Sequence, residues 1–147
     1  MLTAVLVLAA PATAAMTLTK SERALFQAVN SARTTRGLPP LRVDRTLTRA
    51  ARSHSQVMLV ENRLDHGDFA ARMRHFGATG RALAENLAWG SGSFARARSI
   101  VLGWLNSPHH RANLLRPGFT RIGLGAAVGS FAGERSATVV TANFAGV

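Results

Sequence analysis

The sequence predicts an α+β domain in which helices cover an antiparallel sheet. Helical apolar periodicity dominates the chain up to about residue 115, whereas later residues alternate around glycines or are rich in β-branched side chains. The chain has 147 residues, of which 47% are hydrophobic, enough for one domain with its own core. No apolar run of about 18 residues or more occurs, so we expect no permanent transmembrane helix.

The first fifteen residues, MLTAVLVLAAPATAA, have the pattern of a secretory signal peptide. An apolar run from Leu2 to Ala10 is followed by Pro11 and by small residues that suit a signal peptidase. The pattern lacks a Lys or Arg before the apolar run, and a buried N-terminal helix or strand is the alternative. We expect residues 1–15 to be a signal peptide and residues 16–147 to form a single domain. That domain would be secreted or periplasmic, with no transmembrane anchor after cleavage.

The chain contains no cysteine, which excludes disulfides, thiol nucleophiles and Cys-ligated zinc. Its formal net charge is +11, from 18 basic and 7 acidic residues, and Lys20 is the only lysine. Such a charge attracts anionic surfaces, namely phospholipid head groups, acidic envelope polymers or nucleic acid. Because the arginines are scattered and tyrosine is absent, we expect no dedicated nucleic-acid binding.

Three helical stretches are expected at the start of the domain. The first follows a capping sequence at Thr19 and stops at Gly37. The second follows Asp44 and runs to about Asn62, and a shorter third helix ends at Gly77.

The remaining elements lead from helices into strands. The segment from Ala82 to Trp89 is less regular, a fourth helix follows Ser93, and residues 108–115 form a turn that can carry a short helix. Residues 121–128 and 136–144 read as strands joined in a hairpin.

Five histidines are present, and they do not have equal claims to a functional role. His54 lies on the apolar face of the second helix, where we expect a satisfied core histidine. His75 ends the third helix, where a positive charge complements the helix dipole. His66 lies in a polar loop, and His109 and His110 lie at a turn-to-helix junction.

Glu85 is conspicuous because it lies in an apolar stretch of an acid-poor chain. Burying its carboxylate requires a partner or a raised pKa. Two imidazoles and a carboxylate are the usual set for a zinc-type site or for acid–base chemistry. Since no local motif links them, a shared site of His66, Glu85 and His110 competes with independent structural roles.

Four segments resemble, in the same order, the CAP superfamily (also called the SCP or PR-1 type), and especially its small bacterial secreted members. Residues 25–33 with 37–41 are similar to the family's first helix and turn, and Leu64-Asp65-His66 is similar to its L-S-H segment. Residues 84–87 are similar to G-E-N-I. Residues 104–115 are similar to W-x-N-S-P-G-H-R-x-N-I-L, the most specific of the four, and the whole similarity runs from about residue 21 to 144.

The resemblance implies an α-β-α sandwich with a central groove that carries two histidines and one or two acidic residues. A divalent cation such as zinc is bound there in some members. By position, His66 and His110 are the groove histidines and candidate metal ligands. Glu85 is the groove acid and a candidate acid–base residue. His109 stands where glycine is common.

The match also departs from the family pattern. Ser107 stands where many animal members have a second groove glutamate, Ala84 replaces a glycine and Asp65 replaces a serine. We expect three further residues to support the groove structurally, namely Asn86, Asn113 and Trp104.

Two functions follow from the resemblance. The expected one is a secreted CAP/SCP-domain protein whose groove binds a small apolar or anionic ligand, a lipid, a divalent metal or a cell-envelope component. The alternative is a protease- or nuclease-like hydrolase, in which metal on His66 and His110 activates water and Glu85 moves the proton. Two histidines are few for catalytic zinc, and no nucleophile elbow is present, so we expect binding rather than turnover.

Overall fold

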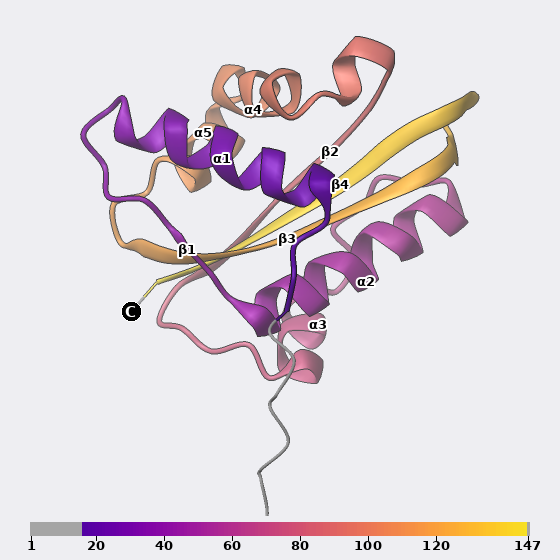
Figure 1. Ribbon diagram of the computed structural model, residues 1–147. Coiled ribbons are helices and arrows are strands. Elements are labelled where there is room, and N and C mark those ends of the chain that lie inside the picture. The colour runs from indigo at the N-terminus through magenta and orange to yellow at the C-terminus, as the bar shows by residue number, and fades with distance from the viewer. Residues whose placement is uncertain (1–15, 147) are drawn as a thin grey trace, which may run out of the picture.

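The central sheet is built mainly from the last two strands of the chain (Figure 1). The computed structural model describes residues 16–146, so the expected signal peptide lies outside the described residues. Strands β3 (Phe119–Phe131) and β4 (Glu134–Gly146) form the predicted antiparallel hairpin. Strand β2 (Leu83–Ser91) pairs antiparallel with β4, and β1 (Arg42–Val43) pairs with β3 in the order β1-β3-β4-β2.

The sheet differs from the sequence prediction in two details. The two-residue strand β1 is parallel to β3, whereas the three long strands are antiparallel as predicted. The segment from Ala82 to Trp89, expected to be less regular, forms most of β2 and continues into the 3-10 turn η1 (Gly92–Ala95). Its polarity does not alternate because three consecutive residues, Glu85 to Leu87, are all buried. The alternation of apolar and polar residues that indicates a strand is therefore absent from this segment of the sequence.

Helices cover both faces of this sheet, which confirms the predicted α-β-α sandwich (Figure 1). Helices α2 (Arg45–Glu61) and α3 (Phe69–Phe76) lie on one face. Helices α1 (Lys20–Thr34), α4 (Ala97–Asn106) and α5 (Pro108–Leu114) lie on the other. None of the helices between residues 16 and 146 is long and apolar enough to cross a membrane.

Side-chain caps determine where the first helices begin. The Thr19 hydroxyl accepts a hydrogen bond from the Glu22 amide, and the Glu22 carboxylate accepts one from the Thr19 amide, so α1 starts with a capping box. Asp44 caps α2 by accepting from the Leu47 amide. These are the positions that the capping residues in the sequence predicted.

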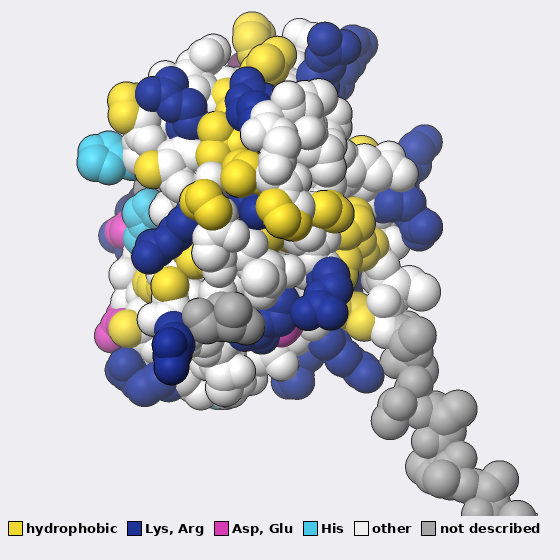
Figure 2. Space-filling view, turned by 90° about the vertical axis from the view of Figure 1, so that its left-hand side faces the viewer, with side chains coloured by type: hydrophobic (Ala, Val, Ile, Leu, Met, Phe, Trp, Pro, Cys, Tyr) yellow, Lys and Arg dark blue, Asp and Glu magenta, His cyan; other side chains and the backbone are white. Residues whose placement is uncertain are grey.

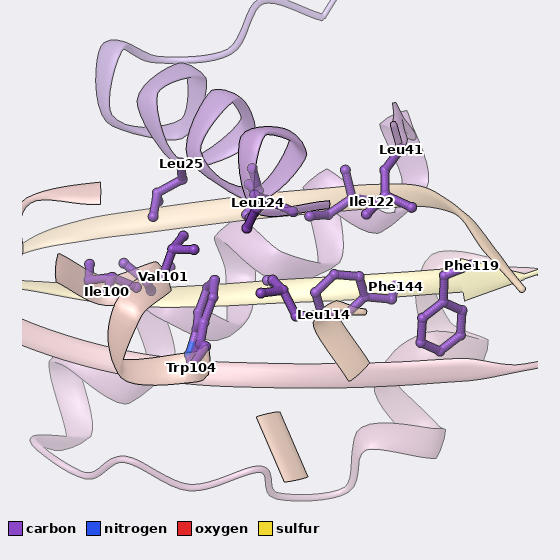
Figure 3. Packing of buried hydrophobic residues seen from close by; sticks show 14 residues of the cluster. Leu25, Leu41, Ile100, Val101, Trp104, Leu114, Phe119, Ile122, Leu124 and Phe144 are labelled. Carbon is purple, nitrogen blue, oxygen red and sulfur yellow. The ribbon is translucent and has the colours of Figure 1, made fainter. Parts of the chain in front are cut away.

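Glycines in β3 set the distance between α2 and the sheet. A Cβ on Gly123 would lie 2.0 Å from the Leu47 carbonyl carbon, and one on Gly125 would lie 2.3 Å from that of Ala51. The helix backbone therefore rests directly on the strand. The alternating residues Ile122 and Leu124 pack on the opposite face, into the larger core beneath α1 and α4 (Figure 3).

In this chain without cysteines, a buried arginine links segments that lie far apart in the sequence. The Arg33 side chain is fully buried, and its guanidinium donates to the carbonyl oxygens of Pro39, Leu114, Arg116 and Phe119 at 2.9–3.2 Å. Burial lowers the pKa of this group. Its four acceptors join the end of α1 to the loop that leads from α5 into β3.

Candidate functional site

The Glu85 carboxylate is the centre of a buried polar network on β2. Its side chain is only 2% exposed, and both oxygens have cationic or imidazole partners. Oε1 accepts a hydrogen bond from His66 Nδ1 at 2.9 Å, and Oε2 accepts one from Arg72 Nη2 at 2.6 Å. Since an ionised carboxylate only accepts, His66 carries a proton on Nδ1. Among the described residues the Nε2 atom of His66 has no hydrogen-bond partner, and the His66 side chain is 56% exposed.

Arg72 is the functional neighbour that the sequence analysis missed. It lies on α3, is 13% exposed, and uses Nη1 to donate to the His66 carbonyl oxygen at 3.0 Å. One guanidinium therefore holds both the carboxylate and the loop that carries His66. In chain order Arg72 is one of many scattered arginines, and nothing beside it indicated a carboxylate partner.

His54 also reaches this network from α2. It is buried, its Nε2 lies 2.8 Å from the Asp65 carbonyl oxygen, and the same atom lies 3.9 Å from Glu85 Oε1. Burial lowers the pKa of His54, and the nearby charges of Arg72 and His66 act in the same direction against the attraction of Glu85. His54 is therefore a satisfied core histidine, as expected, and in addition forms the inner wall of the site.

Asn143 is another contact that sequence reasoning missed. It lies on β4 directly opposite Glu85. In the amide orientation that gives both of its ends a partner, Asn143 donates to Glu85 Oε2 at 3.0 Å. An asparagine on the neighbouring strand thus supplies an amide to the carboxylate.

His110 is joined to the same strand through backbone contacts. The Asn86 amide donates to the His110 carbonyl oxygen at 2.9 Å. Asn113 in turn donates to Asn86 Oδ1 at 3.0 Å and to the Glu85 carbonyl oxygen at 3.3 Å. Burial lowers the pKa of the half-buried His110 ring, and the charges of His66 and His109 lower it further. The start of α5 is thus held against β2.

Trp104 holds strand β2 at Leu87, two residues after Glu85. Its ring is buried in the main core, and Nε1 donates to the Leu87 carbonyl oxygen at 2.9 Å (Figure 3). Together with the two asparagines, this indole hydrogen-bonds the outer edge of β2 where Glu85 and Leu87 lie.

A pocket of about 360 Å³ lies beside His110 between β2, η1 and α4. Its lining is mostly apolar and includes Trp89, Phe94 and Trp104, so both tryptophans of the chain contribute to it. Among the described residues that line it, His110 is the only one that titrates. A second hollow of about 270 Å³ is lined by residues that include His54 and Arg72, on the α2 side.

These contacts show which of the three predicted residues the structure brings together. Glu85 and His66 are in direct contact, and His110 is linked to Glu85 through Asn86 and Asn113. His109 is exposed, and it does not line the pocket that His110 lines.

The donor atoms at this site do not make a complete zinc site. Within residues 16–146 no group of three His, Asp or Glu side chains is placed to hold a metal ion. The Glu85 oxygens are bound to Arg72 and His66, which leaves two imidazoles where zinc usually takes three or four protein ligands. The divalent cation stays a prediction.

The α-β-α sandwich, in which a glutamate of the edge strand β2 pairs with a histidine of the loop after α2, defines the protein as a CAP-type domain. The chain belongs to the family described as CAP, the cysteine-rich secretory protein family, whose sequence profile matches residues 26–144. It is similar to YkwD of Bacillus subtilis, with 36% identity over 130 residues, which cover 79% of this chain and 49% of YkwD.

Solved structures show the same fold. An extracellular protein containing an SCP domain from Bacillus anthracis is 25% identical, with a TM-score of 0.73 over 90% of this chain and 45% of that protein. An outer surface protein of Borrelia burgdorferi has a TM-score of 0.72 at 20% identity, over 90% of this chain and 97% of that one. The chain spans half or less of the curated relatives it matches, 49% of YkwD and 32% of the B. subtilis membrane protein YlbC. It is a CAP domain of bacterial type.

Proposed function

We propose that this CAP domain is exported and acts as a binding module, holding a small ligand with an apolar part in the pocket beside His110. The observation that carries the proposal is the pocket itself. Its volume of about 360 Å³ lies within the roughly 300–1,000 Å³ typical of small-molecule sites. Aromatic walls beside one imidazole are typical of a site that binds a ligand by burying its apolar surface and orients the ligand through one polar contact.

The hydrogen bonds and the burial of Glu85 favour a domain that binds a ligand over one that catalyses a reaction. A general base needs a lone pair that can reach a substrate proton, but both Glu85 oxygens already accept hydrogen bonds and the side chain is nearly inaccessible. We therefore assign Glu85 the role of orienting His66. If the hydrolase alternative were correct, Glu85→Gln would abolish the hydrolysis of a defined peptide or nucleic-acid substrate while leaving the domain folded.

Export and an anionic partner are supported by the leader sequence, by the relatives and by charge. The first fifteen residues have a signal-like pattern, and two of the similar structures are named as extracellular or outer-surface proteins. Figure 2 shows basic side chains spread over one face of the molecule with few acidic ones between them. A surface of this kind attracts anionic ligands and envelope polymers.

Fluorescence titration with the apolar anion 1-anilinonaphthalene-8-sulfonate tests the pocket. Gly103 of α4 lines the pocket, and a Cβ at this position would meet no atom within 4 Å, so Gly103→Leu adds apolar volume at the pocket wall. We expect this variant to weaken probe binding by about tenfold, equivalent to about 1.4 kcal/mol.

The matched control is Ser31→Leu, which fills a different hollow, between α1 and α4, and should leave the affinity unchanged. Equal affinity in both variants and the parent would contradict the proposed site. Loss of binding at moderate salt in all three proteins would assign the binding to the arginine-rich surface instead.

A further inference from the structure

The outer edge of β2 has a hydrogen-bonding pattern that can be worked out residue by residue. In an antiparallel strand, the N–H and C=O of one residue point to the same side, and alternate residues share that side. The carbonyl oxygens of Glu85 and Leu87 accept from Asn113 and Trp104, which lie outside the sheet. The pairing of β2 with β4 is continuous from Leu83 to Ser91. The backbone of Trp89 therefore also points away from β4.

Among the described residues that line the pocket, three outward main-chain groups of β2 have no hydrogen-bond partner. Within residues 16–146, no hydrogen bond reaches the N–H of Leu87, or the N–H or C=O of Trp89, from outside the sheet. Leu87 as a whole is 5% exposed, so a donor here that lacks a protein partner has little access to bulk water. Both residues line the pocket beside His110. The pocket thus includes a stretch of strand edge that is open at the Leu87 N–H and at Trp89, and is closed at the Leu87 carbonyl by Trp104.

The walls of the pocket lie on both sides of that edge. Leu64, from the loop after α2, lies on one side, and Phe94 with Gly103 lies on the η1 and α4 side. The η1 turn is held tightly, because a Cβ on Gly90 would lie 2.4 Å from the Phe94 carbonyl oxygen. Phe94 itself is 74% exposed, so a fixed turn presents an apolar ring at the rim.

We propose that the natural occupant of this pocket is an extended peptide segment, which adds to β2 as a fifth strand by pairing with the N–H of Leu87 and with the N–H and C=O of Trp89. This inference rests on the proposed function and names its ligand class. Successive side chains of an added strand point to opposite faces, which matches apolar walls on two sides. The net charge of +11 favours acidic residues flanking an apolar centre.

The main-chain groups distinguish a peptide from a hydrocarbon ligand. An acyl chain can fill the same apolar volume, but it leaves the two N–H groups and the Trp89 carbonyl buried without partners. Each buried unsatisfied group costs about 1–3 kcal/mol. A peptide backbone supplies a matching carbonyl and amide at the spacing of the strand.

The test uses the peptide acetyl-Glu-Val-Leu-Val-Leu-Glu-amide and two analogues, one N-methylated at both valines and the other at both leucines. Only one set of amides can face β2, so one analogue should lose about tenfold or more in affinity, while the other binds like the parent. In hydrogen-exchange NMR, the amides of Leu87 and Trp89 should exchange about tenfold more slowly with the parent peptide bound. The amide of Ala88, already directed at β4, should not change.

The outcomes separate this inference from the proposed function. Equal binding by both N-methylated analogues, or unchanged exchange at Leu87 and Trp89, overturns strand addition. If the naphthalene sulfonate binds in a manner blocked by Gly103→Leu while the peptide does not bind, the peptide inference is wrong and the pocket remains a small-molecule site. If neither probe binds, both are wrong.

Discussion

Replacing Arg72 with methionine should destabilise the domain by about 3 kcal/mol, because it leaves a buried carboxylate without its cation. Glu85 and Arg72 are 2% and 13% exposed, and their charged atoms are 2.6 Å apart. Because each charge is spread over its whole group, the centres of the two charges lie farther apart than these atoms. Two charges about 4 Å apart attract by about 4 kcal/mol at an effective dielectric constant of about 20. The hydrogen bond from His66 remains in the variant and offsets part of this loss.

Equilibrium urea unfolding at pH 8 measures the effect, and a double-mutant cycle isolates it. In Arg72→Met with Glu85→Gln neither charge remains, so we expect the double variant to lose less than the sum of the single variants, with a coupling of about 2 kcal/mol. Arg63→Met is the matched control. Arg63 is 66% exposed and lies 3.5 Å from the carboxylates of Glu61 and Asp65, so its loss should cost less than about 0.5 kcal/mol. If Arg72→Met is no more destabilising than Arg63→Met, Arg72 is not what allows Glu85 to be buried.

Three other perturbations test the fold and the groove. Gly123→Ala should cost about 3 kcal/mol or more in chemical unfolding because its Cβ would lie 2.0 Å from the α2 backbone, whereas Gly103→Ala on α4 should be neutral or stabilising by about 0.5–1 kcal/mol. Burial alone would raise the pKa of Glu22, but hydrogen bonds from Arg52 and Thr19 hold it below its ordinary value of 4.5. Its contribution to stability is therefore present above that value and lost as the pH falls below it, so Glu22→Gln should cost about 2 kcal/mol at pH 7 and progressively less below pH 4.5. Zinc should bind weakly, because two imidazoles supply half of a tetrahedral set. Both His66→Ala and His110→Ala should weaken it further by about tenfold, and equal calorimetric affinities in all three proteins would refute a groove cation.

Local signals predicted the helices well because their causes are local. Thr19 and Asp44 cap the helices that follow them, and a cap requires only a side chain and an amide three residues away. Strand β2 escaped prediction because it is buried on both faces. Burial of Glu85 and Asn86 beside Leu87 removes the alternation by which an exposed-face strand is recognised.

The site was predictable only in part, for a physical reason of the same kind. A carboxylate in an apolar stretch must find a partner, and from that rule Glu85 was singled out. Which partner it finds is a matter of long-range packing. Arg72 reaches it because α3 returns to the edge of the sheet, and Asn143 reaches it because β4 lies opposite β2. Neither of these two contacts with Glu85 can be predicted from a local sequence pattern.

The position of β3 and β4 at the middle of the sheet has a consequence for how the protein is made. Strand β2 and the short strand β1 can pair only with strands that are synthesised after them. The contacts that fix Arg33 span 81 to 86 residues to reach the end of α5 and the start of β3. During synthesis from the N-terminus, the residues before Phe119 therefore have no sheet on which to pack. The sheet, and with it the packing of helices on both of its faces, can therefore be completed only after the last hairpin has been synthesised.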